Sequence, residues 1–175
     1  MPFRSRRAAP VRRVRKRAVW VNIPFGNVPF TESVGSQLLL VPEDWEASFT
    51  GLTNERAVLR AIVGEVCFSQ TVVGTAGGNW FWGIYMAGIG KPVPVFTTTG
   101  MSDVSWLRVG ARTTSTSVTG TLNVMSSIFS EPIEIKAKRK LDTNQQITMC
   151  AQFANDAAAP AGFFSGVLRF LVARD

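Results

Sequence analysis

The sequence predicts an all-β domain behind a short basic arm, and three observations support this prediction. Short apolar segments alternate with clusters of Gly, Pro, Asn, Asp, Ser and Thr along residues 18–175, which is typical of a sandwich or barrel of strands. In the last third of the chain, apolar and polar residues alternate with a period of two, as in strands with one wet face. The first seventeen residues are strongly basic. We therefore divide the chain into an arm, 1–17, and a β domain, 18–175.

The arm carries eight cations, and the first acidic residue of the chain is Glu32. The cations are Arg4, Arg6, Arg7, Arg12, Arg13, Arg15, Lys16 and Arg17. A segment with this charge and few large apolar groups cannot bury a core, so we expect it to be disordered when free. Flexible cationic chains neutralise phosphates and release counterions without reading base sequence. We predict that the arm binds nucleic acid. A nuclear-localisation signal, which can coexist with binding, and a solubilising tail are the alternatives.

The charge of the rest of the chain is close to neutral. The whole chain of 175 residues has a formal net charge of +7, from nineteen basic and twelve acidic residues. Since eight of the basic residues lie in the arm, eleven remain to face all twelve acids. This asymmetry indicates a polyanionic partner for the arm and not for the whole surface.

Eight segments of the β domain have the composition of strands. They are residues 36–41, 58–68, 80–89, 104–109, 118–124, 133–138, 147–154 and 164–172. The stretch 57–65 has a mixed pattern that also fits a helix, and we assign it to a strand because Val63 and Gly64 favour that state. The stretch 42–46 predicts one helical turn, because proline and acidic residues favour the first turn of a helix.

The alternation in the last three segments predicts which side chains form the core. These residues are Ile133, Ile135, Ile147, Met149, Phe153, Leu168, Phe170 and Val172. The two cysteines, Cys67 and Cys150, lie in apolar runs, and we expect both to be buried and reduced. Two cysteines cannot form a disulfide framework.

A second group of candidate nucleic-acid-binding residues lies in the β domain. Lys136, Lys138 and Lys140 share one face of their strand, with Arg139 between them. They form either a basic patch that extends the arm or an ordinary solvated face whose lysines guard a sheet edge. Trp20, close to the arm, is a candidate for base stacking, with core packing as the alternative. The remaining tryptophans fit the core or a subunit interface; they are Trp45, Trp80, Trp82 and Trp106.

The sequence offers little for catalysis. The chain contains no histidine, the residue of most general bases, catalytic triads and zinc sites. We expect no enzymatic activity, no cofactor and no metal. Glu43, Asp44 and Glu46 are possible calcium ligands at a subunit contact, but an acidic helix start explains them better. No apolar run approaches the roughly 18 residues of a membrane span, so no membrane partner is expected.

The end of the chain has a recognisable pattern. The alternating strand Ile-Glu-Ile-Lys-Ala-Lys-Arg-Lys-Leu, at 133–141, leads through a polar turn into Ile-Thr-Met-Cys-Ala-Gln-Phe-Ala-Asn, at 147–155, and then into a last apolar strand. Together with the basic arm, this resembles the capsid proteins of small circular, Rep-encoding single-stranded DNA viruses. The same layout occurs in capsid proteins of small satellite viruses. The resemblance covers the whole chain in architecture and residues 131–174 in pattern.

The resemblance implies a single jelly roll of two four-stranded antiparallel sheets, which matches the strand count. It implies a homo-oligomer of the simplest, sixty-subunit icosahedral kind, with the arm inside on viral single-stranded DNA. The location would be the virion, with the host nucleus also reached through the arm. The host receptor is unknown. Jelly-roll topology also leads us to expect the strands of Cys67 and Cys150 to be neighbours in one sheet.

Two other classes of function compete with this interpretation. The first is a non-capsid nucleic-acid-binding β-barrel module that acts as a monomer and makes no large assembly. The second is a nuclease on a β scaffold, which needs clustered carboxylates for metal, whereas the acidic residues here are scattered.

Overall fold

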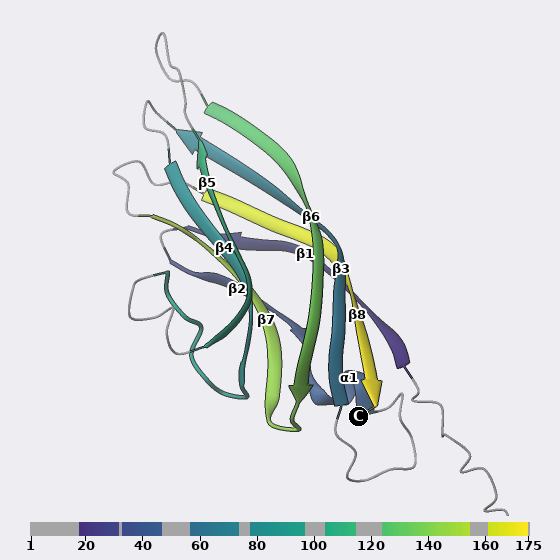
Figure 1. The fold of residues 1–175 in the computed structure, drawn as a ribbon. Coiled ribbons are helices and arrows are strands. Elements are labelled where there is room, and N and C mark those ends of the chain that lie inside the picture. The colour runs from purple at the N-terminus through teal and green to yellow at the C-terminus, as the bar shows by residue number, and fades with distance from the viewer. Residues whose placement is uncertain are drawn as a thin grey trace, which may run out of the picture.

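The computed structural model describes residues 18–31, 33–46, 57–73, 78–96, 104–114, 124–154 and 161–174. These residues form eight strands and one short helix (Figure 1). The elements are β1 (Ala18–Phe30), β2 (Gly35–Leu40), α1 (Pro42–Glu46), β3 (Ala57–Val73), β4 (Gly78–Gly88), β5 (Ser105–Thr114), β6 (Val124–Leu141), β7 (Gln145–Phe153) and β8 (Ala161–Arg174).

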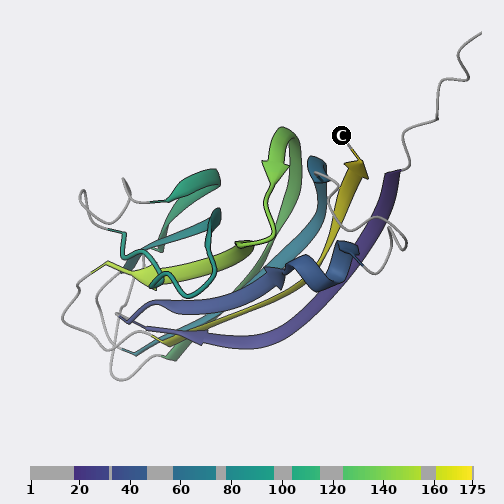
Figure 2. The same ribbon diagram turned by 90° about the horizontal axis from the view of Figure 1, so that it is seen from below.

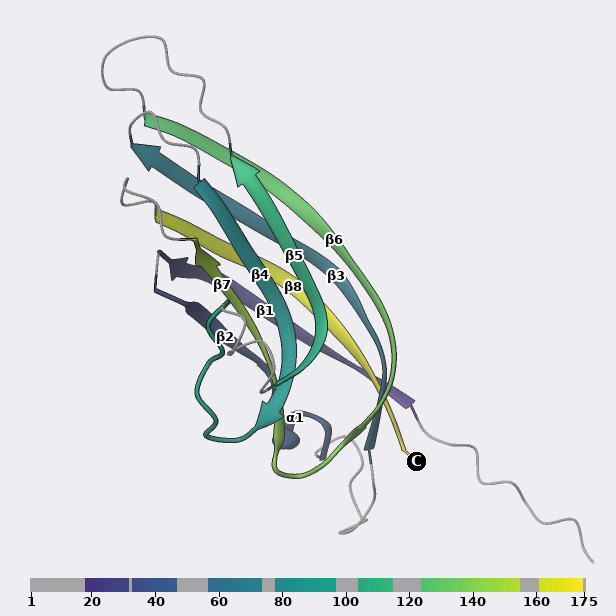
Figure 3. The ribbon, with the colours of Figure 1, turned by 60° about the vertical axis from the view of Figure 1, so that its left-hand side comes forward.

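The strands form two antiparallel sheets, packed face to face as layers (Figures 2 and 3). Sheet A has the order β1-β8-β3-β6, and sheet B has the order β2-β7-β4-β5. The first strand pairs with the last, the second with the seventh, the third with the sixth and the fourth with the fifth. Successive pairs alternate between the sheets, which is the topology of a jelly roll. The predicted fold class is confirmed.

This topology contradicts one prediction about the cysteines. Cys67 lies on β3 in sheet A and Cys150 on β7 in sheet B, so their strands are not neighbours. The reason is the alternation of pairs, which places β3 between β8 and β6, and β7 between β2 and β4. Both thiols are free, as expected, but only Cys150 is fully buried, whereas Cys67 is partly exposed.

Seven of the eight predicted segments fall on strands, and the stretch 57–65 is a strand and not a helix. The predicted turn 42–46 is α1. The eighth segment, 118–124, lies outside the described residues except for its last residue, which begins β6. The sequence did not predict β1, because Pro24, Pro29 and Asn27 interrupt its pattern. Prolines are tolerated there since β1 is an edge strand, and Asn27, with a φ of 48°, lies where the register shifts.

The core lies between the sheets, and all eight residues predicted for it are buried. Aromatic rings from both sheets fill one end of it, with Phe30 stacked on Phe153 at 4.9 Å between ring centroids and Phe68 at 4.8 Å from Trp80. Trp80 and Trp82 share a face, as predicted, and that face points into the core. Trp45 is also buried in the core.

At one side of the sandwich an ion-pair cluster joins the two sheets. Glu131 on β6 accepts from Arg112 at 2.8 Å and lies 3.5 Å from Arg108, and both arginines are on β5. Because β5 is an edge of sheet B and β6 an edge of sheet A, this cluster ties the edges together.

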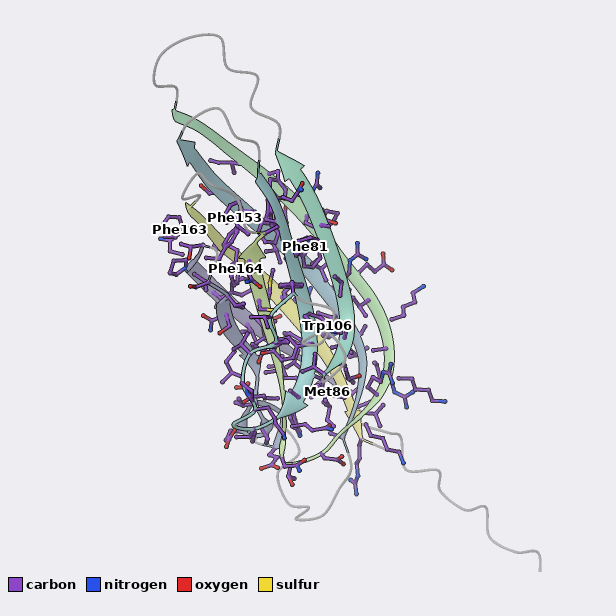
Figure 4. All side chains as sticks on the ribbon, turned by 90° about the vertical axis from the view of Figure 1, so that its left-hand side faces the viewer. Phe81, Met86, Trp106, Phe153, Phe163 and Phe164 are labelled. Atoms are coloured by element: carbon purple, nitrogen blue, oxygen red, sulfur yellow. The ribbon has the colours of Figure 1, made fainter. Side chains whose placement is uncertain are left out.

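The outer face of sheet B, which points away from the core, is partly covered, although Leu38 and Val109 at its edges are exposed. Phe96, in the segment after β4, stacks on Phe81 at 5.9 Å and contacts Trp106 at 5.4 Å between centroids, and its N–H donates to Gln152. Figure 4 labels Phe81 and Trp106. Under this cover, residues of the outer face such as Tyr85 and Cys150 are buried.

Candidate nucleic-acid interface

The outer face of sheet A carries the predicted site residues that the structure describes. On β1, Val21 and Ile23 pack against the core, so Trp20 points outward and is 43% exposed. On β6, Ile133 and Ile135 point inward and are buried, so Lys136 points outward and is exposed. Both outward orientations follow from the period of two in a strand.

The strand register places Trp20 and Lys136 in one row across sheet A. Trp20 is opposite Leu171 on β8, Leu171 is opposite Ala61 on β3, and Ala61 is opposite Lys136 on β6. The two residues therefore lie on the same face at opposite edges, three strand spacings or about 14 Å apart. The structure thus places on one face two candidates that are far apart in the sequence.

The start of β1 and the end of β6 lie at the same end of sheet A (Figure 1). Ala18 pairs with Ala173, Ala173 with Val58, and Val58 with Lys140. The arm ends at Arg17, directly before this row. The arm residues themselves, Arg4, Arg6, Arg7, Arg12, Arg13, Arg15, Lys16 and Arg17, lie outside the described residues. Ala18, which follows the arm in the chain, nevertheless lies at the same end of sheet A as the cations of β6, on the opposite edge strand.

We call Lys136, Lys138, Arg139 and Lys140 the lysine run. All four are exposed. A bulge lies within the run, because Leu59 pairs with Arg139 and Ala61 with Lys136, which leaves two residues of β6 opposite one of β3. β6 is an edge strand, so lysines there also discourage edge-to-edge pairing. Both interpretations of this cluster remain consistent with the structure.

Arg169 on β8 is a residue of this face that the sequence prediction missed. Its guanidinium carbon lies 5.0 Å from the centroid of the Trp20 ring, a cation–π contact. Its Nε donates a hydrogen bond of 3.1 Å to Oδ1 of Asn22, its partner in the register. Trp20 therefore does not pack in the core. The period of two in the last strand puts Arg169 on the face opposite to Leu168 and Phe170, but only the pairing of β1 with β8 puts it beside Trp20.

Exposed apolar side chains lie toward the opposite end of the same face. Phe163 and Val167 on β8 are 45% and 50% exposed, and Ile128 on β6 is 76% exposed. Phe163, Ser69 and Ile128 form one row across β8, β3 and β6. The outer face of sheet A thus carries the lysine run at one end and exposed apolar side chains toward the other.

Glu43 and Asp44 lie in the first turn of α1, where Asp44 caps the N-terminus of the helix. Asp44 accepts a hydrogen bond of 2.9 Å through Oδ2 from the backbone N–H of Val41, an interaction of the capping-box kind. Among the described residues, no group of three or more His, Cys, Asp or Glu side chains is placed to hold a metal ion. The described part of the chain also contains no helix long and apolar enough to cross a membrane.

No family model and none of the curated proteins matches the chain. Among solved structures, it is similar to Eiger TNF from S. frugiperda, with 11% identity and a TM-score of 0.31 over 87% of this chain and 91% of that one. It is also similar to chains of infectious bursal disease virus. For the Gt strain the identity is 11% and the TM-score 0.27, over 99% of this chain and 42% of that chain. For the Gx strain the values are 14% and 0.28, over 99% and 41%. The chain spans less than half of each virus chain, and these identities and TM-scores are too low to assign a family.

Proposed function

We propose that this chain is a viral coat protein. Its jelly-roll bodies assemble into a closed shell, of the simplest sixty-subunit icosahedral kind, and its arms hold viral single-stranded DNA inside. The observation that carries the proposal is that Ala18, which follows the arm in the chain, lies at the same end of sheet A as the lysine run. On this proposal, the cations of the arm and of the lysine run meet the nucleic acid on one side of the body.

The distribution of charge supports this function. Eleven basic and twelve acidic residues beyond the arm leave the body nearly neutral, so many bodies can approach one another without strong repulsion. The arms and the lysine run meet the packaged phosphates. On this proposal, the outer face of sheet A lines the inside of the shell. The protein encloses and neutralises its cargo without turnover, and its location is the virion.

Electron microscopy of the purified full-length protein tests the proposal. We expect closed particles of uniform size, which carry nucleic acid that a nuclease cannot digest until the particles are disrupted. A protein that binds nucleic acid but stays monomeric at all concentrations would contradict the proposal and favour the non-capsid binding module.

A further inference from the structure

The basic end of the outer face of sheet A combines an exposed aromatic ring with fixed cations. Trp20 is 43% exposed, and the Arg169 guanidinium lies over its ring at 5.0 Å from the centroid. The hydrogen bond from Arg169 to Asn22 holds that guanidinium in place. The ring and the guanidinium are two planar groups, on which a nucleobase can stack. They stand on the paired backbones of β1 and β8, so they are held in place before a ligand arrives.

Two partly exposed apolar residues, Leu171 and Ala61, lie between Trp20 and Lys136 in their row. Lys136 and Lys138 lie beyond them, on the edge strand β6. The distance of about 14 Å from Trp20 to Lys136 corresponds to about four stacked nucleotides. A short stretch of polynucleotide can therefore reach both groups at once.

The charge of this end favours a polyanion over a second copy of the chain. The cations of this face are Lys136, Lys138, Lys140 and Arg169, while Glu134 is the acidic residue that shares a row with Arg169. In a symmetric contact between two copies, each basic face would meet another basic face, and like charges would repel. Phosphates neutralise the same charges.

We propose that this end of the outer face of sheet A is a binding platform for single-stranded nucleic acid. An unpaired base stacks on the exposed surface that the Trp20 ring and the Arg169 guanidinium form together, and the adjoining phosphates contact Lys136 and Lys138. The bases of a duplex are stacked within the helix and cannot reach the ring, so the platform selects single strands. This inference rests on the proposed function and deepens it, because it states which form of nucleic acid the shell takes up.

The test uses the full-length chain and three fluorescently labelled probes. They are a single-stranded oligothymidylate of about twelve nucleotides, within the range of single-strand sites, an abasic strand with the same phosphates, and a duplex of equal length. We expect the wild-type protein to bind the oligothymidylate more tightly than the abasic strand. Trp20→Ala should weaken binding of the oligothymidylate about tenfold, the loss of one stacked base, and leave the abasic strand unaffected. Trp20→Phe should retain most of the preference.

Phe163→Ala is the matched control, because Phe163 is 45% exposed on the same face but lies at its apolar end. It should leave all three affinities unchanged. Melting temperatures of the variants verify that each is folded.

The remaining outcomes overturn the inference in distinguishable ways. Equal binding of the oligothymidylate and the abasic strand by the wild type would mean that charge alone accounts for binding, and the packaging function would survive without the platform. Tighter binding of the duplex would likewise overturn the platform. A Trp20→Ala variant that fails to assemble but keeps the preference for bases would make this face a contact between copies. Failure of the wild-type protein to bind any probe would overturn the proposed function itself.

Discussion

The outer faces of the two sheets differ in what covers them. On sheet B, Phe96 and Trp106 lie over the strands, so that Thr148 and Cys150 are buried although they point away from the core. On sheet A, the corresponding face leaves Trp20 and Phe163 close to half exposed. Both faces carry aromatic side chains, but on sheet B Tyr85 is buried and Phe81 and Trp106 are only partly exposed. A covered face contributes to stability, whereas an uncovered face with aromatic and basic side chains is available to a partner.

The largest effect on the free energy of unfolding is expected from a comparison of two neighbouring phenylalanines on β8, both labelled in Figure 4. Phe164 is fully buried and contacts the rings of Phe25, Phe30 and Phe68, whereas Phe163 points to the outer face of sheet A. Phe164→Ala should lower the free energy of unfolding by about 3–5 kcal/mol. Phe163→Ala should lower it by less than about 1 kcal/mol. Denaturant unfolding measures both, and similar losses would mean that the assignment of faces is wrong.

A smaller effect is expected where glycines make room for the cover of sheet B. A Cβ atom at Gly83 would overlap the ring of Trp106, whereas one at Gly26, on the edge strand of sheet A, would meet no atom within 4 Å. Gly83→Ala should therefore displace Trp106 and destabilise the protein by about 1–3 kcal/mol. Gly26→Ala should change stability by less than about 1 kcal/mol in either direction. Thermal melting of the two variants measures the difference, and a neutral Gly83→Ala would show that the cover is loose.

The two cysteines allow a chemical comparison of the same two faces, because Cys67 lies on sheet A and Cys150 on sheet B. Burial raises the pKa of the Cys150 thiol from 9.0 to about 12. Its proton therefore stabilises the fold fully below pH 9.0, and this contribution is lost as the pH rises toward 12. Cys150→Ala should flatten the alkaline fall in melting temperature relative to the wild type. In the folded protein at about pH 8, a thiol reagent should modify the partly exposed Cys67 and spare Cys150.

Cys67→Ala is the control for the labelling, and it should abolish the rapid reaction of the folded protein with the thiol reagent. If Cys150→Ala abolished the rapid reaction instead, the burial of Cys150 on the outer face of sheet B would be contradicted.

The smallest effect on stability is expected from the arm. Deletion of residues 1–17 removes eight cations and no acidic residue, and we expect the body to fold without them. The free energy of unfolding should change by less than about 0.5 kcal/mol. Binding should change much more. With about five to eight phosphate contacts, the full-length protein should show a log–log salt slope on the order of −4 to −6 on single strands, and the deletion a shallower one. A large loss of stability would place the arm in the folded body.

The period of two in the sequence was sufficient to predict the core and the faces of the last strands. Ile133, Ile147 and Phe170 lie inside because their neighbours in sequence are forced to the opposite face. The sequence pattern did not predict β1, because an edge strand tolerates prolines that argue against a strand elsewhere.

What the sequence could not provide was the relation between distant segments. Which strands are neighbours is decided by long-range pairing, so the placement of Cys67 and Cys150 in one sheet was wrong. For the same reason the contact of Arg169 with Trp20 was not predicted, since it depends on the register of the first strand against the last. The cover of sheet B depends likewise on where Phe96 returns to the sheet.

The nucleic-acid content of purified particles tests the central claim most directly. Particles from the full-length protein and from the deletion of residues 1–17 should be compared by the ratio of their absorbance at about 260 and 280 nm, which separates nucleic acid from the aromatic residues of the protein. We expect full particles from the complete chain, and empty particles or particles of altered size from the deletion, because the contacts between bodies remain. Particles of the deletion that carry a normal load would contradict the account, and the lysine run would then become the leading candidate for the packaging site.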